Sequence, residues 1–276
     1  MPPSSTQKAL ATQFVQLTGA SDRTAQRYLK NSGYKINEAV DAYFSGTSGT
    51  TTPTTSALDT SLGQMFDKLR GTDDSRDEKD TMGVESTMAY LENLGVDLEN
   101  AEMLVVAELL QSPSIGAITK KGYIDGWKTT GSATRQAHAA HVKSLVNTLA
   151  TDPAYFKKVY RYTFVASKEE NQKALALDTA KVYWSVLFSP PGWQWKTKSH
   201  DWLELWSSFL DEKWTRSVNR DMWNMILEFA TKTMSDETLS FWNEDGAWPS
   251  VIDDFVAWCR EKGVGKADSA LMDVDA

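Results

Sequence analysis

The sequence predicts an all-α protein of two domains. From Leu58 onward, apolar residues recur at the three- and four-residue spacing that gathers them on one face of an α-helix. The alternation of apolar and polar residues that is typical of a half-buried strand is nearly absent. A stretch rich in Thr, Ser and Gly, residues 47–56, has no apolar periodicity and is interpreted as a flexible linker between a short N-terminal part and a longer remainder.

The N-terminal part, residues 7–46, is predicted to be a small bundle of three helices. Gly19 ends the first helix, Ser21 caps the second and Asn37 caps the third. The apolar residues at helical spacing are Leu10, Phe14, Leu17, Ala25, Tyr28, Leu29, Ala39, Val40, Tyr43 and Phe44. Because about forty residues bury only a small core, we expect the stability of this bundle to be modest.

Ten further helices are predicted in residues 57–262. Their periodic stretches are 58–70, 84–94, 98–111, 120–129, 133–149, 153–165, 173–188, 200–212, 218–233 and 250–261. All eleven tryptophans lie between Trp127 and Trp258, and such large side chains usually anchor cores and interfaces. We therefore expect most tryptophans to be buried. The polar tail, residues 263–276, is expected to be disordered.

Composition narrows the classes of function. The formal net charge of -8 argues against a nucleic-acid-binding protein, which needs a basic face, and favours a basic protein partner. One cysteine and three histidines exclude a disulfide framework and a zinc-finger site. Such cysteine usage is typical of a reducing compartment, so a cytoplasmic and nuclear location is expected. No apolar run reaches the ~18 residues of a membrane span, and residues 1–5 do not resemble a signal peptide.

Covalent chemistry is not expected of this chain. Cys259 follows Trp258 at a helix position that should face inward, so we interpret it as a small buried hydrophobe. His138 and His141 share a helix without an acidic or cysteine ligand beside them and are interpreted as a solvated face. The sequence contains no hydrolase, phosphate-loop or metalloprotease motif. No catalytic residue, metal site or cofactor is predicted.

Residues 74–85 have the length of an EF-hand calcium loop between two helices. Asp74 and Glu85 occupy its first and twelfth positions. Arg76 stands at the third position, and Lys79 replaces the glycine of the sharp turn at the sixth. These two cations disfavour calcium binding and a calcium-regulated switch, although the helix–loop–helix geometry can persist without the metal.

Two carboxylates near predicted helix starts stand out in the C-terminal region. Asp221 lies in the first turns of a helix capped by Ser217 or Asn219, and Ser250 with Asp253 forms a capping box. Both carboxylates are explained if they only complement the helix dipole. The alternative is an acidic docking patch at the two helix starts, with a small residue between them. From residue 211 onward 14 acidic and 7 basic residues give a net charge of -7, so both interpretations stay open.

The segment from Glu99 to Leu110 is apolar on nearly all sides, and Ile115 and Ile118 follow just beyond it. A segment of this kind is more often plain core. The other interpretation is a groove that takes an apolar segment of a partner.

The C-terminal region resembles a known family. The residues that carry the resemblance are Asp221-Met-Trp-Asn, the run from Glu244 to Val256, and the run from Val182 to Phe188. They are similar to the PONY domain of the defective-in-cullin-neddylation proteins, and the resemblance covers residues 57–262. The N-terminal bundle resembles the UBA-like domain that precedes PONY in one branch of that family. The resemblance implies degenerate EF-hand-like helix pairs and a scaffold-type ligase, or co-ligase, for cullin neddylation.

The resemblance also implies two docking sites. An acidic patch for the cullin C-terminal winged-helix region falls on Asp221, Ala247 and Asp253. A hydrophobic pocket for the acetylated N-terminal Met of the neddylation conjugating enzyme falls on Met103, Leu104, Val106, Ala107, Ile115, Ile118, Tyr183 and Val186. Thr87 and Ala166 are smaller or more polar than the large apolar residues expected in such a pocket.

The resemblance of the N-terminal bundle is less complete. Ubiquitin-binding versions carry a Met-Gly-aromatic motif in the first loop, where this chain has Thr18-Gly19-Ala20. The apolar anchor is missing, so weak affinity for ubiquitin is expected at most. The alternative hypothesis for the whole chain is a ubiquitin-binding adaptor whose helical domain grips another partner without promoting a ligase reaction.

Overall fold

The structure is a computed structural model, and it describes residues 5–18, 20–45, 55–71, 79–169 and 171–265. The chain divides into two compact units, residues 1–67 and 68–276. Thirteen helices and four two-residue strands are present in the described residues, which confirms the predicted all-α class. No helix in this part of the chain is long and apolar enough to cross a membrane.

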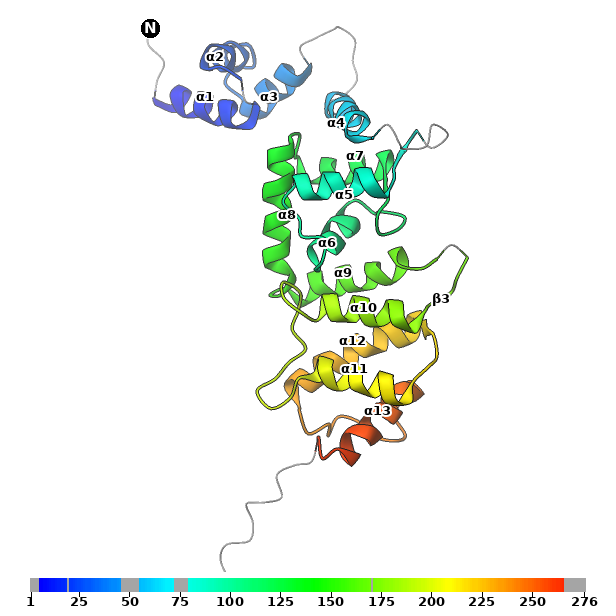
Figure 1. Cartoon of the computed structure of the whole chain (residues 1–276). Helices are drawn as coiled ribbons and strands as arrows, with labels where there is room; N and C mark the ends of the chain where they lie inside the picture. Colours follow the sequence, from blue (N-terminus) through cyan, green and yellow to red (C-terminus); the bar gives the residue numbers. More distant parts are fainter. Residues whose placement is uncertain (1–4, 19, 46–54, 72–78, 170, 266–276) are drawn as a thin grey trace, which may run out of the picture. The chain divides into compact units, whose positions relative to one another are not determined.

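The first unit contains the predicted three-helix bundle. It consists of α1 (Ser5–Thr18), α2 (Asp22–Asn31) and α3 (Ile36–Ser45), drawn in blue in Figure 1. The ring of Phe14 contacts those of Tyr28 and Tyr43, and this aromatic group packs with Ala25 and Leu29. These few side chains form a small core, as expected from the length of the bundle.

Of the two helix caps predicted for this bundle, one is confirmed and the other is wrong. The Ser21 side chain accepts a hydrogen bond from the backbone N–H of Thr24, which confirms it as the cap of α2. α3 begins at Ile36, so Asn37 lies within its first turn rather than at its cap. The next helix, α4 (Thr55–Leu69), already includes the last two residues of the predicted linker. The rest of that linker and most of the calcium-like loop lie outside the described residues.

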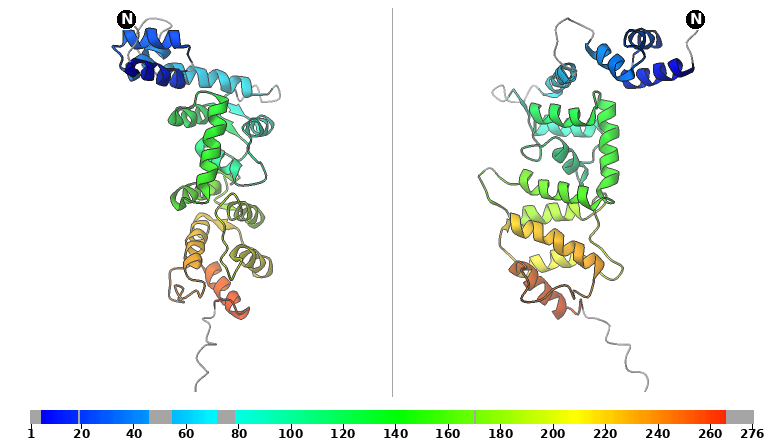
Figure 2. Two further views of the ribbon diagram at one scale, coloured as in Figure 1. Left: turned by 90° about the vertical axis from the view of Figure 1, so that its left-hand side faces the viewer. Right: turned by 180° about the vertical axis from the view of Figure 1, so that it is seen from behind.

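The larger unit holds nine of the described helices and two small sheets. The helices are α5 (Val84–Asn93), α6 (Glu102–Leu109), α7 (Lys120–Thr130), α8 (Arg135–Leu149), α9 (Pro153–Ala166), α10 (Leu177–Leu187), α11 (Trp202–Lys213), α12 (Arg220–Ser235) and α13 (Ser250–Glu261). Figures 1 and 2 show α8 running along one edge of this unit, crosswise to α5, α6 and α9.

Short antiparallel strands join the helices of the larger unit in pairs. β1 (Thr81–Met82) pairs with β2 (Ile118–Thr119), and β3 (Ala174–Leu175) pairs with β4 (Val218–Asn219). Each strand leads directly into a helix, namely α5, α7, α10 or α12. Two helix–loop–helix units joined by one such strand pair resemble paired EF hands, the geometry that the family resemblance implied.

Three predicted helix starts are corrected by the structure. The stretches predicted from residues 173 and 218 begin with β3 and β4, because these residues pair across the sheet before each helix starts. The helix predicted from residue 98 begins at Glu102. Before it, the side chains of Asp97 and Asn100 accept hydrogen bonds from the backbone N–H groups of Glu99 and Glu102, and such Asx turns compete with a helix.

The core of the larger unit is built from aromatic side chains, as the tryptophan distribution predicted. Six tryptophans are almost completely buried: Trp127, Trp184, Trp195, Trp202, Trp206 and Trp223. At the centre, the Tyr160 hydroxyl donates to the carbonyl of Trp223 (2.8 Å) and accepts from Nε1 of Trp184 (2.9 Å). The rings of Trp184 and Trp223 stack with centroids 5.3 Å apart. This core ties α9, α10 and α12 together.

The prediction that the histidines of α8 form a solvated face is wrong for His138. Its ring is 0% exposed and stacks on Trp127, with centroids 3.8 Å apart. His138 Nε2 lies 3.0 Å from the carbonyl of Ser132, and Nδ1 lies 3.4 Å from the hydroxyl of Tyr90. These contacts fit a neutral ring that donates from Nε2, and burial lowers the pKa of His138 to about 4. His141, one turn further on, is half-buried.

The first three residues of the predicted disordered tail, 263–265, are ordered in the structure. The backbone N–H of Val264 donates to the carbonyl of Cys259 (2.9 Å), and Val264 packs against the core. Residues 263–265 therefore belong to the packed structure, and residues 266–276 lie outside the described part of the chain.

Candidate functional site

An apolar cavity of about 200 Å³ opens between α5, α6 and the segment that leads to β2. Its lining residues are Val84, Thr87, Met88, Leu91, Leu98, Met103, Val106, Ala107, Ser112, Ile115, Gly116 and Ile118. Val84 is 58% exposed and Met88 is 46% exposed, so the mouth of the cavity has an apolar rim. Pockets for drug-sized ligands measure roughly 300–1,000 Å³, so this volume suits one or two side chains of a partner.

Local backbone geometry places the walls of this cavity. The register of the first sheet sets Met82 opposite Ile118, which fixes the end of the lining segment. The backbone N–H of Ile115 donates to the carbonyl of Ala166 (3.1 Å), and this bond ties the segment to the end of α9. Gly116 has a φ of 103°, a conformation that strains any residue with a side chain. The segment therefore turns at Gly116 and presents Ile115 and Ile118 to the cavity.

Most of the pocket residues predicted from the sequence line this cavity. They are Met103, Val106, Ala107, Ile115 and Ile118. Leu104 is completely buried in the core of the unit. Tyr183 and Val186 lie on α10, are half-buried, and pack against the same core without lining the cavity. The assignment of all eight residues to a conjugating-enzyme pocket stays a prediction.

The two positions that looked unsuited to the pocket have ordinary structural roles. Thr87 lines the cavity, is 2% exposed, and donates a hydrogen bond from its hydroxyl to the carbonyl of Met82 (3.4 Å). Because this hydroxyl has a partner, it does not carry the full cost of a polar group in an apolar wall. Ala166 is buried, and its carbonyl accepts the bond from Ile115.

Asp221 lies in the first turn of α12 with an exposed side chain. The helix is capped by Asn219, whose side chain accepts a hydrogen bond from the backbone N–H of Met222 (2.8 Å). Asn219 is thus one of the two caps that the sequence suggested. Since the cap is provided by another residue, the carboxylate of Asp221 is available at the helix start, where the dipole also favours it.

Asp253 lies in the first turn of α13, but the predicted capping box is wrong. The cap position is Pro249, which has no side-chain hydrogen bond, and Ser250 is the first residue of the helix. Oδ1 of Asp253 instead accepts a hydrogen bond from Nε1 of Trp242 (2.9 Å), and both side chains are half-buried. The carboxylate is therefore held by an indole and not by the backbone of a capping box.

Ala247 is exposed in the loop between α12 and α13. This loop is anchored on both sides of a turn at Gly246: Phe241 and Trp248 both pack against Phe229 of α12, with ring centroids 5.4 and 5.8 Å away. A Cβ atom on Gly246 would lie 2.9 Å from the carbonyl of Asn243, so only glycine fits. The small Ala247 side chain follows that turn.

The three predicted patch residues lie on the neighbouring elements α12 and α13 and their connecting loop (orange and red in Figure 1). Phe255 of α13 contacts Phe229 of α12, with centroids 5.8 Å apart. Phe229 is eight residues beyond Asp221, or about 12 Å along the helix axis. The structure thus joins Ala247 and Asp253 in one loop–helix segment and sets Asp221 on the adjacent helix. It does not test their role in cullin binding.

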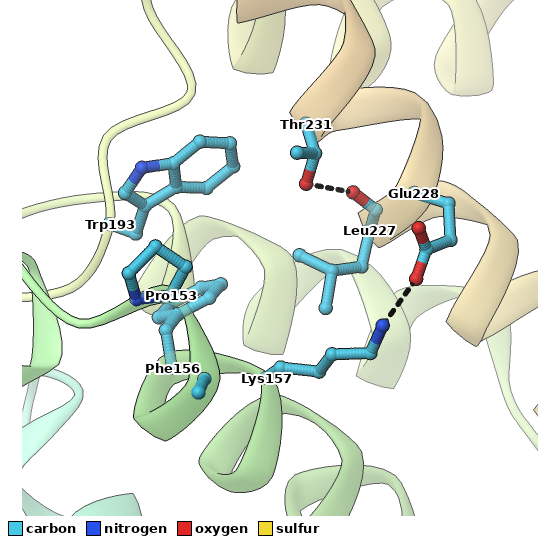
Figure 3. Close-up of a pocket in the computed structure, with 8 residues that line it drawn as sticks. Pro153, Phe156, Lys157, Trp193, Leu227, Glu228 and Thr231 are labelled. Atoms are coloured by element: carbon cyan, nitrogen blue, oxygen red, sulfur yellow. Dashed lines mark hydrogen bonds and ion pairs between the residues drawn. The ribbon is translucent and has the colours of Figure 1, made fainter.

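A second hollow, of about 280 Å³, lies between α9, α12 and the loop that carries Trp193 (Figure 3). Phe156, Trp193 and Leu227 form its apolar walls, and an ion pair between Lys157 and Glu228 (2.6 Å) borders it. None of the site residues predicted from the sequence lines this hollow.

The structure shows the state of Cys259 and of possible metal ligands in the described residues. Cys259 is 0% exposed, and burial raises the pKa of its thiol to about 12, so it is the inert buried residue that the sequence predicted. In the described part of the chain no three His, Cys, Asp or Glu side chains are grouped to hold a metal ion. What the described residues offer is two apolar hollows and two carboxylates in the first turns of α12 and α13.

Comparison with known proteins identifies the family. The model of a cullin-binding domain matches residues 137–258, and the model of a UBA-like domain matches residues 8–49. A Pyricularia oryzae protein called Defective in cullin neddylation protein 1 is 40% identical over 287 aligned positions, which cover 100% of both chains. The chain belongs to the defective-in-cullin-neddylation family.

More distant relatives agree with this assignment. The Yarrowia lipolytica protein of the same name is 32% identical, with 90% of this chain and 94% of the relative covered. Human DCN1-like protein 4 is 30% identical, with 72% of this chain and 62% of the relative covered. The cullin-binding match contains the whole predicted patch, whereas the apolar cavity lies ahead of it in the chain.

Sequence reasoning missed several residues of the candidate cavity and patch. Val84 and Met88, at the rim of the cavity, belong to a helix that was predicted only from its periodicity, and their exposure distinguishes them. Gly116 carried a usable signal, since a glycine between Ile115 and Ile118 suggests an unusual backbone. Trp242 was counted only as one tryptophan among eleven, and nothing in the sequence pairs it with Asp253.

Proposed function

We propose that this chain is a scaffold-type ligase for cullin neddylation that holds a cullin and the modifier-loaded conjugating enzyme together. The observation that carries the proposal is that one compact unit, residues 68–276, holds an apolar cavity and, apart from it, carboxylates in the first turns of two helices that pack together. An exposed acidic patch includes Asp221 and Asp253, and an apolar cavity is lined by Met103 and Ala107. Holding two reactants together raises their effective concentration and restricts their orientation, without a nucleophile on the scaffold.

The acidic patch is proposed to bind a basic face of the cullin C-terminal winged-helix region. Complementary charge speeds the encounter and fixes its orientation, and both carboxylates stand at helix starts with exposed or half-exposed oxygens. The small side chain of Ala247 leaves room for close approach between them.

Binding of a recombinant cullin winged-helix fragment to the full chain tests the patch. We expect Asp221→Asn/Asp253→Asn to weaken binding at least tenfold, because two charge-assisted contacts are lost. The melting temperature should barely change, since an amide oxygen at position 253 can still accept from Trp242. Asp254→Asn, an exposed carboxylate in the same helix turn, is the matched control. Equal affinity of the double variant and the wild type would refute the patch.

The apolar cavity is proposed to bind the acetylated N-terminal Met of the conjugating enzyme. Acetylation removes a positive charge that would be costly to bury, so an apolar cavity distinguishes the two forms. Titration of the full chain with acetylated and unacetylated N-terminal peptides should show binding of the acetylated peptide only. Ala107→Met, which fills the cavity from its wall, should abolish that binding and leave cullin binding intact. Equal binding of both peptides would contradict the assignment.

A reconstituted modification reaction tests the scaffold mechanism as a whole. Adding the chain to loaded conjugating enzyme and cullin should accelerate modifier transfer, and the patch and cavity variants should each remove most of that acceleration. Cys259→Ser should retain full activity, because no residue of the chain takes part in the bond exchange. An unchanged rate in the presence of the wild-type chain would reject the ligase function.

The match to a UBA-like domain supports a second candidate, a ubiquitin-binding adaptor. In the first loop, Ala20 is buried and the Thr18 hydroxyl donates to the carbonyl of Phe14 (2.7 Å), while Leu17 is 58% exposed. Leu17, near the end of α1, is therefore an exposed apolar side chain beside this loop. Titration of the full chain with ubiquitin, compared with Leu17→Ser, tests this function separately from neddylation.

A further inference from the structure

Trp242 connects the loop after α12 to the carboxylate of Asp253. Its indole Nε1 donates to Oδ1 of Asp253 (2.9 Å), and its backbone N–H donates to the carbonyl of Leu239 (3.1 Å). The turn before it is closed by Asp236, whose carboxylate accepts hydrogen bonds from the backbone and side chains of Thr238 and Ser240. Both ends of this connection are thus fixed by hydrogen bonds, so the orientation of the carboxylate depends on the indole.

Arg260 of α13 contacts the ring of Trp242. Its guanidinium carbon lies 4.7 Å from the centre of the Trp242 ring, a cation–π contact. Arg260 stands seven residues after Asp253, on the same side of α13 and about 10 Å further along its axis. Within the described residues Arg260 forms no ion pair, and Oδ2 of Asp253 has no hydrogen-bond partner. The indole therefore lies between the carboxylate and the nearest cation of its own helix.

A second tryptophan of the unit, Trp258, also donates a hydrogen bond from its indole to a carboxylate, but that carboxylate has cation partners as well. Nε1 of Trp258 donates to Oε2 of Glu212 (2.9 Å), and Nζ of Lys262 lies 5.1 Å from the Trp258 ring. There, however, Nζ of Lys262 also reaches Oε2 of Glu212 (3.5 Å), and Lys213 pairs with Oε1 (3.3 Å). The Glu212 carboxylate is thus paired with two lysines of the chain, whereas no cation of the described residues pairs with the Asp253 carboxylate.

We infer that Trp242 is a positioning residue for the docking patch. It holds Asp253 through Oδ1, so that Oδ2 accepts from a lysine or arginine of the partner, and it keeps Arg260 on its ring instead of on the carboxylate. The inference rests on the proposed cullin-binding function of the patch. It adds a residue that carries no charge and that neither helix capping nor the acidic motif identifies.

Replacement of the indole by a smaller ring tests the inference. Trp242→Phe removes the N–H donor and keeps an aromatic surface for Arg260, and Trp258→Phe removes the equivalent bond to Glu212. Affinity of the full chain for the cullin winged-helix fragment should fall about three- to tenfold in Trp242→Phe, the effect of losing one typical hydrogen bond. Trp258→Phe should retain wild-type affinity.

Two further measurements separate positioning from a structural role. In the Asp253→Asn background, Trp242→Phe should weaken binding by much less than it does in the wild type, because both changes act on one contact. The ¹⁵N-indole resonance of Trp242, assigned by its loss in Trp242→Phe, should shift in Asp253→Asn and again when the fragment binds.

The outcomes also distinguish this inference from the proposed function. Unchanged affinity in Trp242→Phe, together with weak binding by Asp253→Asn, overturns the positioning role and leaves the patch in place. Wild-type affinity in Asp253→Asn overturns both. Equal losses in Trp242→Phe and Trp258→Phe, or full additivity with Asp253→Asn, would show a general effect on packing and would also overturn the positioning role.

Discussion

The buried ring of His138 makes a specific prediction about stability and pH. His138 is neutral in the folded chain, where it stacks on Trp127 and contacts the carbonyl of Ser132 and the hydroxyl of Tyr90. Replacing it with glutamine removes the titrating group but keeps a polar side chain of similar length. The difference in unfolding free energy between wild type and His138→Gln should therefore depend on pH, and it should shrink as the solution becomes acidic.

The direction and the size of this pH effect follow from the pKa values of His138 in the unfolded and the folded chain. Burial lowers the pKa of His138 from the ordinary 6.5 to about 4. Between these values the unfolded chain binds a proton that the folded chain does not, so the stabilisation is complete above pH 6.5 and is lost as the pH falls towards 4. At about 1.4 kcal/mol for each pKa unit, the loss between pH 7 and pH 4.5 is roughly 2–3 kcal/mol.

Urea unfolding followed by tryptophan fluorescence measures this difference. All eleven tryptophans lie between residues 127 and 258, so the signal reports the larger unit alone. The unfolding free energies of wild type and His138→Gln should approach each other by roughly 2–3 kcal/mol from pH 7 to pH 4.5. Parallel curves for wild type and His138→Gln would show that the folded ring takes up its proton normally and would refute the reasoning.

Three further predictions concern packing. Gly122→Ala should lower the unfolding free energy by about 1–3 kcal/mol in urea, although alanine normally favours a helix, because its Cβ would lie 2.2 Å from the carbonyl of Leu110; an unchanged or higher midpoint would contradict this. Tyr160→Phe should cost roughly 2–4 kcal/mol in the same assay, because the carbonyl of Trp223 and a buried indole lose their partner; a cost below about 1 kcal/mol would argue against this network. The Cys259 thiol should resist a thiol reagent at pH 8 until urea unfolds the chain, and rapid labelling of the native protein would show that it is accessible.

Helix positions were predictable because the signals for them are local. The spacing of apolar residues placed α7, α8, α9 and α13 within two residues of their observed ends. The caps Ser21 and Asn219 were identified for the same reason, since a cap and the N–H group it binds lie three residues apart. The capping box at Ser250 failed because Pro249 occupies the cap position, so Ser250 is already the first residue of the helix, and the Asp253 carboxylate binds the indole of Trp242 instead.

The sequence indicated candidate residues for the patch and the pocket, but not how these residues are arranged in space. The patch positions were predicted from the family resemblance and their role stays a prediction, and five of the eight predicted pocket positions line one cavity. The strand pairs that fix Ile118 and Val218 join segments more than thirty residues apart, and no local pattern encodes such pairing. The exposure of Val84 and Met88 likewise depends on what the rest of the chain leaves uncovered.

By itself, the sequence determined the helical class, the two-part organisation and the acidic character of the C-terminal region, because all three depend on composition and on spacings of a few residues. Only the tertiary structure decided that His138 is buried and neutral, since its contact with Tyr90 spans 48 residues of chain. The tertiary structure also decided which carboxylates have cation partners within the described residues. Glu212 forms ion pairs with two lysines, whereas Asp253 accepts a hydrogen bond from an indole. This difference depends on which side chains are brought together by packing.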